Sequence, residues 1–74
     1  MPMRHAYEAA FALELKNAKA DPVTVKVMEP IPGDWTMLQE NQPHTKEASN
    51  LASWLVQVPA EGAVTLTWRV QVRH

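Results

Sequence analysis

Histidine offers the most versatile chemistry in this sequence, and it occurs at three positions, His5, His44 and His74. Zinc sites on a single helix use closely spaced pairs such as HxxH or HExxH, and no such pair is present. A pairing of His5 with His74 requires the two ends of the chain to meet, as they can in a β-sandwich. We therefore expect solvated histidines, and a metal-dependent hydrolase that uses all three is the least supported hypothesis.

Catalytic nucleophiles and acid–base pairs are also poorly represented. The chain has no cysteine, and neither Ser49 nor Ser53 lies in a nucleophile-elbow motif. Glu29 and Asp34 flank a proline-rich bend, where we expect each carboxylate to accept local backbone hydrogen bonds. Two glycines far apart in the sequence cannot form a phosphate-binding loop. The sequence thus predicts that the protein is not an enzyme and has no catalytic residue, cofactor or resident metal.

The aromatic residues are the better candidates for binding. Trp35 follows a Pro-Gly-Asp bend, where an exposed indole would stack on a sugar ring or a proline-rich peptide. Asp34 and His44 are the polar residues expected to join it in a contact with a ligand or partner. Of the two interpretations of Trp35, a buried or half-buried place in the core is the favoured one, since β-sandwiches commonly bury a tryptophan.

The elements that must position these residues belong to one small domain. The chain has 74 residues, and its seven basic and eight acidic side chains give a net charge of −1. This balance provides no electrostatic footprint for nucleic acid, and no uncharged run approaches the roughly 20 residues of a membrane helix. We expect no nucleic-acid binding, no membrane insertion, and a single domain over residues 1–74 that is ordered from about residue 5 to residue 73.

Alternation of apolar and polar residues predicts several short strands. Strands are expected at Val23–Val27, Trp35–Glu40, Leu51–Val58 and Val64–Val72, with Ala52, Trp54, Val56 and Val58 inward in the third and Val64, Leu66, Trp68, Val70 and Val72 inward in the last. Trp54 and Trp68 are therefore expected in the core.

The segments between these strands carry turn and crossover signals. Asn17–Pro22 has turn residues, and Glu29–Asp34 has two prolines that suit a crossover from one sheet to the other. The polar stretch Asn41–Asn50 is expected to be an exposed loop. In the turn that begins at Pro59, we expect Gly62 to supply a positive φ.

The segment Tyr7–Asn17 fits two secondary structures. Read with a period of two, Tyr7, Ala9, Phe11, Leu13 and Leu15 share one face and the charged residues lie opposite. Read as a helix, Tyr7, Phe11 and Leu15 also form a stripe, and the alanines favour a helix. The helical interpretation leaves Leu13 outside the stripe, so periodicity favours a strand. With the other strands, it predicts an all-β fold, a small antiparallel sandwich of about five to seven strands.

In order along the chain, these segments resemble the C-terminal part of the conserved uncharacterised domain of bacterial mucoidy-inhibitor-like proteins. The matching segments are Leu15–Asn17, Asp21–Val25, Glu29–Trp35, Pro43–His44, Trp54–Ala60, Gly62 and Leu66–Val70. The bend Glu29-Pro30-Ile31-Pro32 followed by an aromatic residue is the most specific of them. Trp68 departs from the pattern, because the family more often has a tyrosine there.

The resemblance implies a strand at Tyr7–Lys16 and an immunoglobulin- or fibronectin-III-like sandwich. It implies an excised domain or a shortened form of a longer protein, and a place outside the cytoplasm, in the periplasm or at the cell surface. It brings no catalytic residues. We therefore expect a non-catalytic, monomeric module that contacts a protein partner or a neighbouring domain of the same parent chain. The alternative is a carbohydrate-binding module that uses Trp35 and the loop 41–50.

Overall fold

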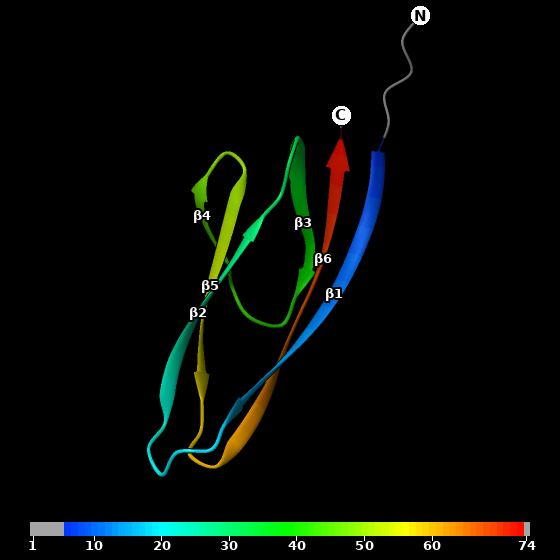
Figure 1. Ribbon diagram of the computed structural model, residues 1–74. Coiled ribbons are helices and arrows are strands. Elements are labelled where there is room, and N and C mark those ends of the chain that lie inside the picture. Colours follow the sequence, from blue (N-terminus) through cyan, green and yellow to red (C-terminus); the bar gives the residue numbers. More distant parts are fainter. Residues whose placement is uncertain (1–5, 74) are drawn as a thin grey trace, which may run out of the picture.

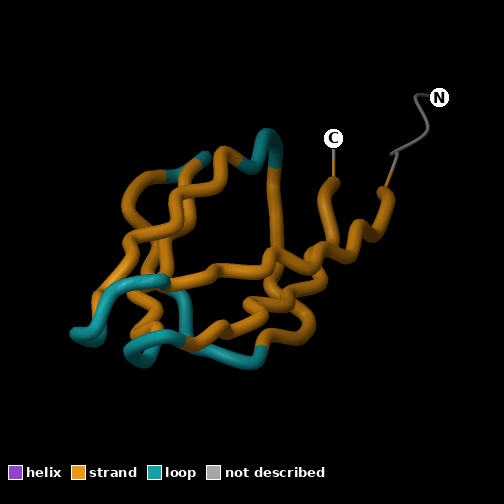
Figure 2. Tube along the Cα trace, turned by 60° about the horizontal axis from the view of Figure 1, so that its bottom comes forward, coloured by secondary structure: helices purple, strands orange, loops and turns teal. Residues whose placement is uncertain are grey.

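The computed structural model describes residues 6–73, which form strands and connecting loops without a helix in that range (Figures 1 and 2). The strands are β1 (Ala6–Asn17), β2 (Val23–Pro30), β3 (Asp34–Glu40), β4 (Thr45–Ala48), β5 (Leu51–Val58) and β6 (Gly62–Arg73). The all-β prediction is confirmed, and six strands lie within the expected range. The described residues contain no helix long and apolar enough to cross a membrane.

The strands form two antiparallel sheets of three strands each. Sheet A has the order β1-β6-β3, and sheet B has the order β2-β5-β4. Strands β1 and β6 pair along their whole length, from Ala6 opposite Arg73 to Asn17 opposite Gly62, and Figure 1 shows them side by side. The bend after β2 carries the chain from sheet B to sheet A, as its prolines predicted.

One apolar core joins the two sheets. The buried residues are Ala52, Trp54, Val56 and Val58 of β5, Leu66, Trp68, Val70 and Val72 of β6, and Ile31 of the bend. Every inward residue predicted for β5 is buried, and so are the inward residues of β6 from Leu66 onward. The rings of Trp54 and Trp68 lie 4.7 Å apart between the sheets. This two-layer arrangement is sandwich-like.

The strand β1 settles the ambiguity that periodicity left at the start of the chain. The segment is a strand, and its apolar residues share one face as predicted. The side chains of Tyr7, Phe11 and Leu13 are nevertheless 47%, 43% and 38% exposed. The reason is position, because β1 is an edge strand, paired with β6 on one side only. Its apolar residues therefore lie at the margin of the core.

Two expectations about loops are wrong. The stretch Asn41–Asn50 is not only a loop, because Thr45–Ala48 pairs with β5 as the short strand β4. Gly62 does not take the positive φ, which belongs instead to Glu61 (φ 49°). Glycine is needed at position 62 for space, since a Cβ there would lie 2.8 Å from Cγ of Pro59.

The turn after β1 and the turn after β5 meet at one end of the molecule, at the bottom of Figure 1. Asn17, buried at the end of β1, links them, since its side-chain amide donates to the carbonyls of Pro59 at 3.2 Å and Asp21 at 2.7 Å. Its side-chain oxygen accepts from the backbone N–H of Lys19 at 2.9 Å, a local Asx turn. One side chain thus holds together the two sheet-to-sheet connections at this end of the molecule.

Candidate functional site

The structure brings Trp35 and His44 together at the end of the sandwich formed by β3, β4 and β5. Their ring centroids lie 5.6 Å apart. Three residues complete what we call the aromatic cluster: Glu40, Lys46 and Trp54. The cluster is thus built from the two ends of β3, the connection after it, and the two strands of sheet B that follow.

Glu40 is the hydrogen-bond acceptor at the centre of the aromatic cluster. Its carboxylate accepts from the indole N–H of Trp54 at 3.1 Å, and both its oxygens lie 3.0 Å from Nδ1 of His44. The backbone N–H of His44 donates to Oε1 at 3.3 Å. Glu40 therefore stabilises the half-buried histidine and the buried tryptophan at the same time.

A β-bulge sets the direction of the Glu40 side chain. In β3, Met37 pairs with Val70 and Gln39 pairs with Arg69, so Leu38 is an extra residue. Strict alternation from Trp35 and Met37 would place Glu40 on the outer face. The bulge shifts the alternation by one residue, and Glu40 faces inward opposite Trp68.

The ring of Trp35 is engaged within the molecule on several sides. Its indole N–H donates to the carbonyl of Ser49 at 3.0 Å. The ammonium group of Lys46 lies over the ring, 5.0 Å from its centroid, in a cation–π contact. Trp35 is half-buried, which agrees with the prediction of a partly buried position. These contacts favour a packing role, because the ring face under Lys46 is covered.

The other candidates do not join the aromatic cluster. Asp34 is exposed at the first position of β3, and alternation directs it to the opposite face from Trp35. Within the described residues its carboxylate makes no hydrogen bond or ion pair. In the same range no group of three His, Asp or Glu side chains could hold a metal ion. His5 and His74, required for the hydrolase hypothesis, lie outside the described residues.

A second polar group lies on the outer face of sheet B. Glu47 of β4 accepts a hydrogen bond from the hydroxyl of Ser53 at 2.7 Å, and its carboxylate lies 3.0 Å from Nζ of Lys26. The Ser53 hydroxyl, followed by the Lys26 ammonium, lowers the pKa of Glu47 from its ordinary value of 4.5. The group links the three strands of sheet B, since Glu47, Ser53 and Lys26 come from β4, β5 and β2.

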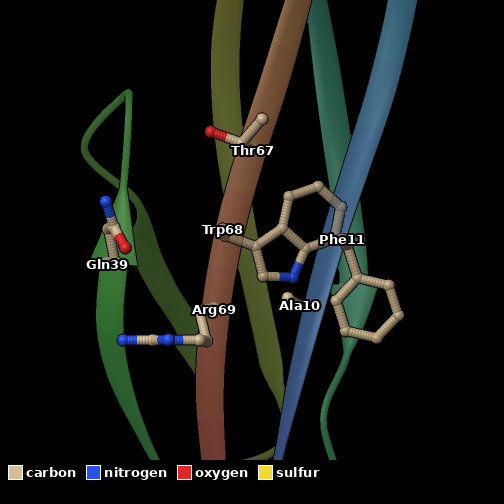
Figure 3. Close-up of a pocket in the computed structure, with 6 residues that line it drawn as sticks. All are labelled: Ala10, Phe11, Gln39, Thr67, Trp68 and Arg69. Carbon is tan, nitrogen blue, oxygen red and sulfur yellow. The ribbon is translucent and has the colours of Figure 1, made fainter.

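A hollow of about 230 Å³ opens at Trp68 (Figure 3). Ala10, Phe11, Gln39, Thr67, Trp68 and Arg69 line it. Figure 3 shows the rings of Phe11 and Trp68 toward β1, and Gln39 and Arg69 toward β3. The rings stack with centroids 5.2 Å apart, and the indole N–H of Trp68 has no acceptor in the described part of the chain. The lining offers no carboxylate or imidazole for acid–base chemistry.

A second hollow, of about 210 Å³, lies beside the apolar row of β1. It is lined by Tyr7, Ala9, Phe11, Val70 and Val72 of sheet A and by Glu29, Pro30, Ile31 and Pro32. Its lining is mainly apolar, and it opens between β1 and the bend that follows β2. Apolar surface thus continues from the core to the margin of the sandwich at β1.

Sequence reasoning missed Glu40, Lys46 and the edge of β1. The inward position of Glu40 could not be predicted, because no pattern in Trp35–Glu40 marks Leu38 as the extra residue of a bulge. Lys46 was not considered, because its segment was interpreted as a loop. The edge had a visible signal, the uncharged run Ala9–Leu13, but its exposure depends on which strand is outermost. No family model, curated protein or solved structure matches this chain.

Proposed function

We propose that the protein is a non-catalytic β-sandwich module that contacts another protein chain, or a neighbouring domain of its parent, through the open edge of β1. The observation that carries the proposal is the form of that edge. It is 12 residues long, is paired in continuous register with β6, and has no strand of residues 6–73 paired on its other side. An extended segment can add to such an edge by β-augmentation.

The four sheet edges differ in how well they would accept a strand. Natural proteins protect edges with bulges, prolines, charges and short strands. Strand β3 has a bulge, β4 has four residues and a bulge, and β2 ends at Pro30 and carries Lys26 and Glu29. Strand β1 has no bulge and no proline, and its three charged residues, Glu8, Glu14 and Lys16, leave the run Ala9–Leu13 uncharged. It is the least protected edge of the described part of the chain.

Apolar surface beside the edge supports the same function. Tyr7, Phe11 and Leu13 are each more than a third exposed on the inner side of β1. A strand added to β1 would bring its own side chains against this row and against the neighbouring hollow of about 210 Å³. Backbone hydrogen bonds would supply affinity, and the apolar row would select apolar side chains.

The contacts of Trp35 support this proposal over the carbohydrate-binding alternative. A sugar-stacking platform needs an open ring face, and Lys46 lies over the ring 5.0 Å from its centroid. The indole N–H, which would otherwise be free for a sugar hydroxyl, donates to Ser49. The alternative with Trp35 and the loop 41–50 stays a prediction.

We also propose an immunoglobulin-like class for the fold and the kinship with mucoidy-inhibitor-like domains. The orders β2-β5-β4 and β3-β6-β1 correspond to the B-E-D and C-F-G orders of that class. In this correspondence β1 takes the place of strand G, the last strand of the immunoglobulin fold, although it is the first strand of this chain. The proposed kinship rests on the Glu29–Trp35 bend. The proposed location outside the cytoplasm rests on this kinship.

Site-specific photo-crosslinking in cells that make the protein tests the proposed function. A benzophenone amino acid is placed at Ala10 on β1, and in a matched control at Thr36 on the opposite edge of sheet A. Both positions are exposed. We expect a discrete protein adduct from position 10 and none from position 36. The absence of an adduct at position 10, or equal adducts at both positions, would contradict the proposal.

A further inference from the structure

We propose that the partner of the β1 edge is a second copy of this chain, paired antiparallel with β1 about a two-fold axis at Ala12. The inference rests on the proposed function, since it names the strand that fills the open edge. The two sheets A would then form one continuous six-stranded sheet, since each contributes three strands. The sequence of β1 itself selects this pairing.

Symmetric pairing leaves only a few registers to choose from. Residues directly opposite one another in an antiparallel pair point to the same face of the sheet. The two-fold axis must therefore pass through a residue and not between two residues. Moving the axis by one residue along β1 changes the residue opposite any given residue by two positions. An axis at Phe11 places Glu8 opposite Glu14 twice, which is repulsive. An axis at Ala12 places Glu8 opposite Lys16 twice, which is attractive.

The neighbouring registers lack this complementarity. An axis at Ala10 places Glu8 opposite Ala12, and an axis at Leu13 places Lys16 opposite Ala10. Neither brings opposite charges together. Among these four registers, only the one centred on Ala12 pairs charges of opposite sign. An axis at Leu15 would also place Glu14 opposite Lys16, but it would pair only residues 13–17 of β1, whereas the axis at Ala12 pairs residues 7–17.

The same register matches the apolar residues on the inner face. It places Phe11 of each copy opposite Leu13 of the other, and Ala9 opposite Leu15. Phe11 and Leu13 are 43% and 38% exposed in the single chain, so each has surface left to bury. Aromatic–aliphatic pairs across antiparallel strands are stabilising. One register thus satisfies both faces of β1.

Contacts within the chain leave the charged side chains available. Glu8 lies 3.6 Å from Nε of Arg69, and Lys16 lies 3.5 Å from a carboxylate oxygen of Glu14. All four side chains are more than half exposed, so these ion pairs contribute little and do not fix the side chains. Glu8 and Lys16 both lie on the outer face of sheet A, so each can pair with the other residue of the second copy.

Sedimentation velocity of charge variants tests the inference. We expect wild-type chain to show reversible dimerisation between about 10 μM and 1 mM, because a single strand pair is a small interface. Lys16→Glu and Glu8→Lys each place like charges opposite one another twice, and each should weaken dimerisation about tenfold. An equimolar mixture of the two variants should regain wild-type affinity as a heterodimer, because every pair is again of opposite sign. The double variant E8K/K16E should regain it as a homodimer.

Two variants serve as controls for charge and for register. Lys19→Glu changes the net charge as Lys16→Glu does but lies beyond β1, and it should leave dimerisation within about twofold of wild type. Glu14→Lys should also change it little, since Glu14 faces Ala10 in this register. With the axis at Phe11, the same variant would strengthen dimerisation. Thermal unfolding of each variant verifies that the fold is retained.

The outcomes separate this inference from the proposed function. A wild-type chain that stays monomeric to 1 mM, as expected from the sequence, would overturn the inference, as would a mixture that fails to regain affinity. If the adduct from position 10 then contains a different protein, the proposed function stands without the second copy. If no adduct forms, both are overturned.

Discussion

Glu40 illustrates how a single acidic residue can organise aromatic side chains. The carboxylate meets the N–H of Trp54 and Nδ1 of His44 at 3.1 and 3.0 Å. Trp54 is 1% exposed, so its N–H depends on a partner within the protein. Glu40 therefore connects the residues of the aromatic cluster. Its hydrogen bonds to His44 fix the imidazole ring in its position beside Trp35.

Replacing Glu40 with alanine should destabilise the protein. The Trp54 N–H would remain buried without its acceptor, which costs about 1–3 kcal/mol. Glu40→Gln keeps an oxygen at the same distance along the side chain and should cost less. Urea unfolding followed by tryptophan fluorescence measures both. Equal stability of Glu40→Ala and wild type would show that the hydrogen bond contributes nothing.

Glu47 should make stability depend on pH in the acidic range. Its pKa is lowered from 4.5 in the folded chain, so the ionised carboxylate stabilises the fold above that value. The stabilisation should decline as the pH falls through the lowered pKa. The difference in unfolding free energy between wild type and Glu47→Gln should therefore shrink toward zero in acid.

A second variant identifies the cause. Ser53→Ala removes the hydrogen bond that is the largest single cause of the shift, so the pKa of Glu47 should move back toward 4.5. Carbon NMR titration of the Glu47 carboxyl group in wild type and Ser53→Ala measures this directly. An unchanged titration would assign the shift to Lys26 alone.

At the scale of elements, the sequence predicted the strands that bury one face. The alternation in β5 and β6 reflects burial, so their inward residues could be read directly. Strand β4 could not be found this way, because its residues Thr45–Ala48 are all exposed and no apolar period exists. For the candidate site, Trp35 and His44 were predicted as candidates, but their contact depends on the bulge and on β4. Asp34 does not join Trp35 in the aromatic cluster, because neighbouring residues of a strand point to opposite faces.

Asn17 should be important for joining the elements at the lower end of the molecule. Asn17→Ala removes the donor to Pro59 and Asp21 and the acceptor for Lys19, at a position 6% exposed. Loss of these partly buried hydrogen bonds should destabilise the fold by about 1–3 kcal/mol. Asn17→Asp keeps the acceptor but not the amide donor. If Asn17→Asp is as stable as wild type in chemical unfolding, the donor bonds to the two turns are dispensable.

At the scale of the whole molecule, the two sheets depend on a narrow core. Trp54 from sheet B and Trp68 from sheet A meet at 4.7 Å in its centre. A small domain has little other apolar material to hold its layers together. The tryptophans therefore determine whether the sandwich exists at all, and the marginal apolar residues of β1 contribute less.

Trp54→Ala and Trp68→Ala should each cost about 3–5 kcal/mol, as large-to-small changes in a core do. For a domain at the low end of the usual 5–15 kcal/mol, either change should nearly unfold it. Leu55→Ala is the control, since Leu55 is 66% exposed, and it should change stability by less than about 0.5 kcal/mol. Losses below about 1 kcal/mol at both tryptophans would contradict the core described above.

The extra residue in β3 has a consequence for sequence comparison. Because Leu38 is absorbed by the bulge, its deletion leaves the pairs on both sides unchanged, with Met37 opposite Val70 and Gln39 opposite Arg69. Insertions and deletions usually fall in loops, yet here a strand contains a position where length can vary. A homologue one residue shorter would best be aligned with its gap at Leu38, which keeps its counterpart of Glu40 facing the buried tryptophan.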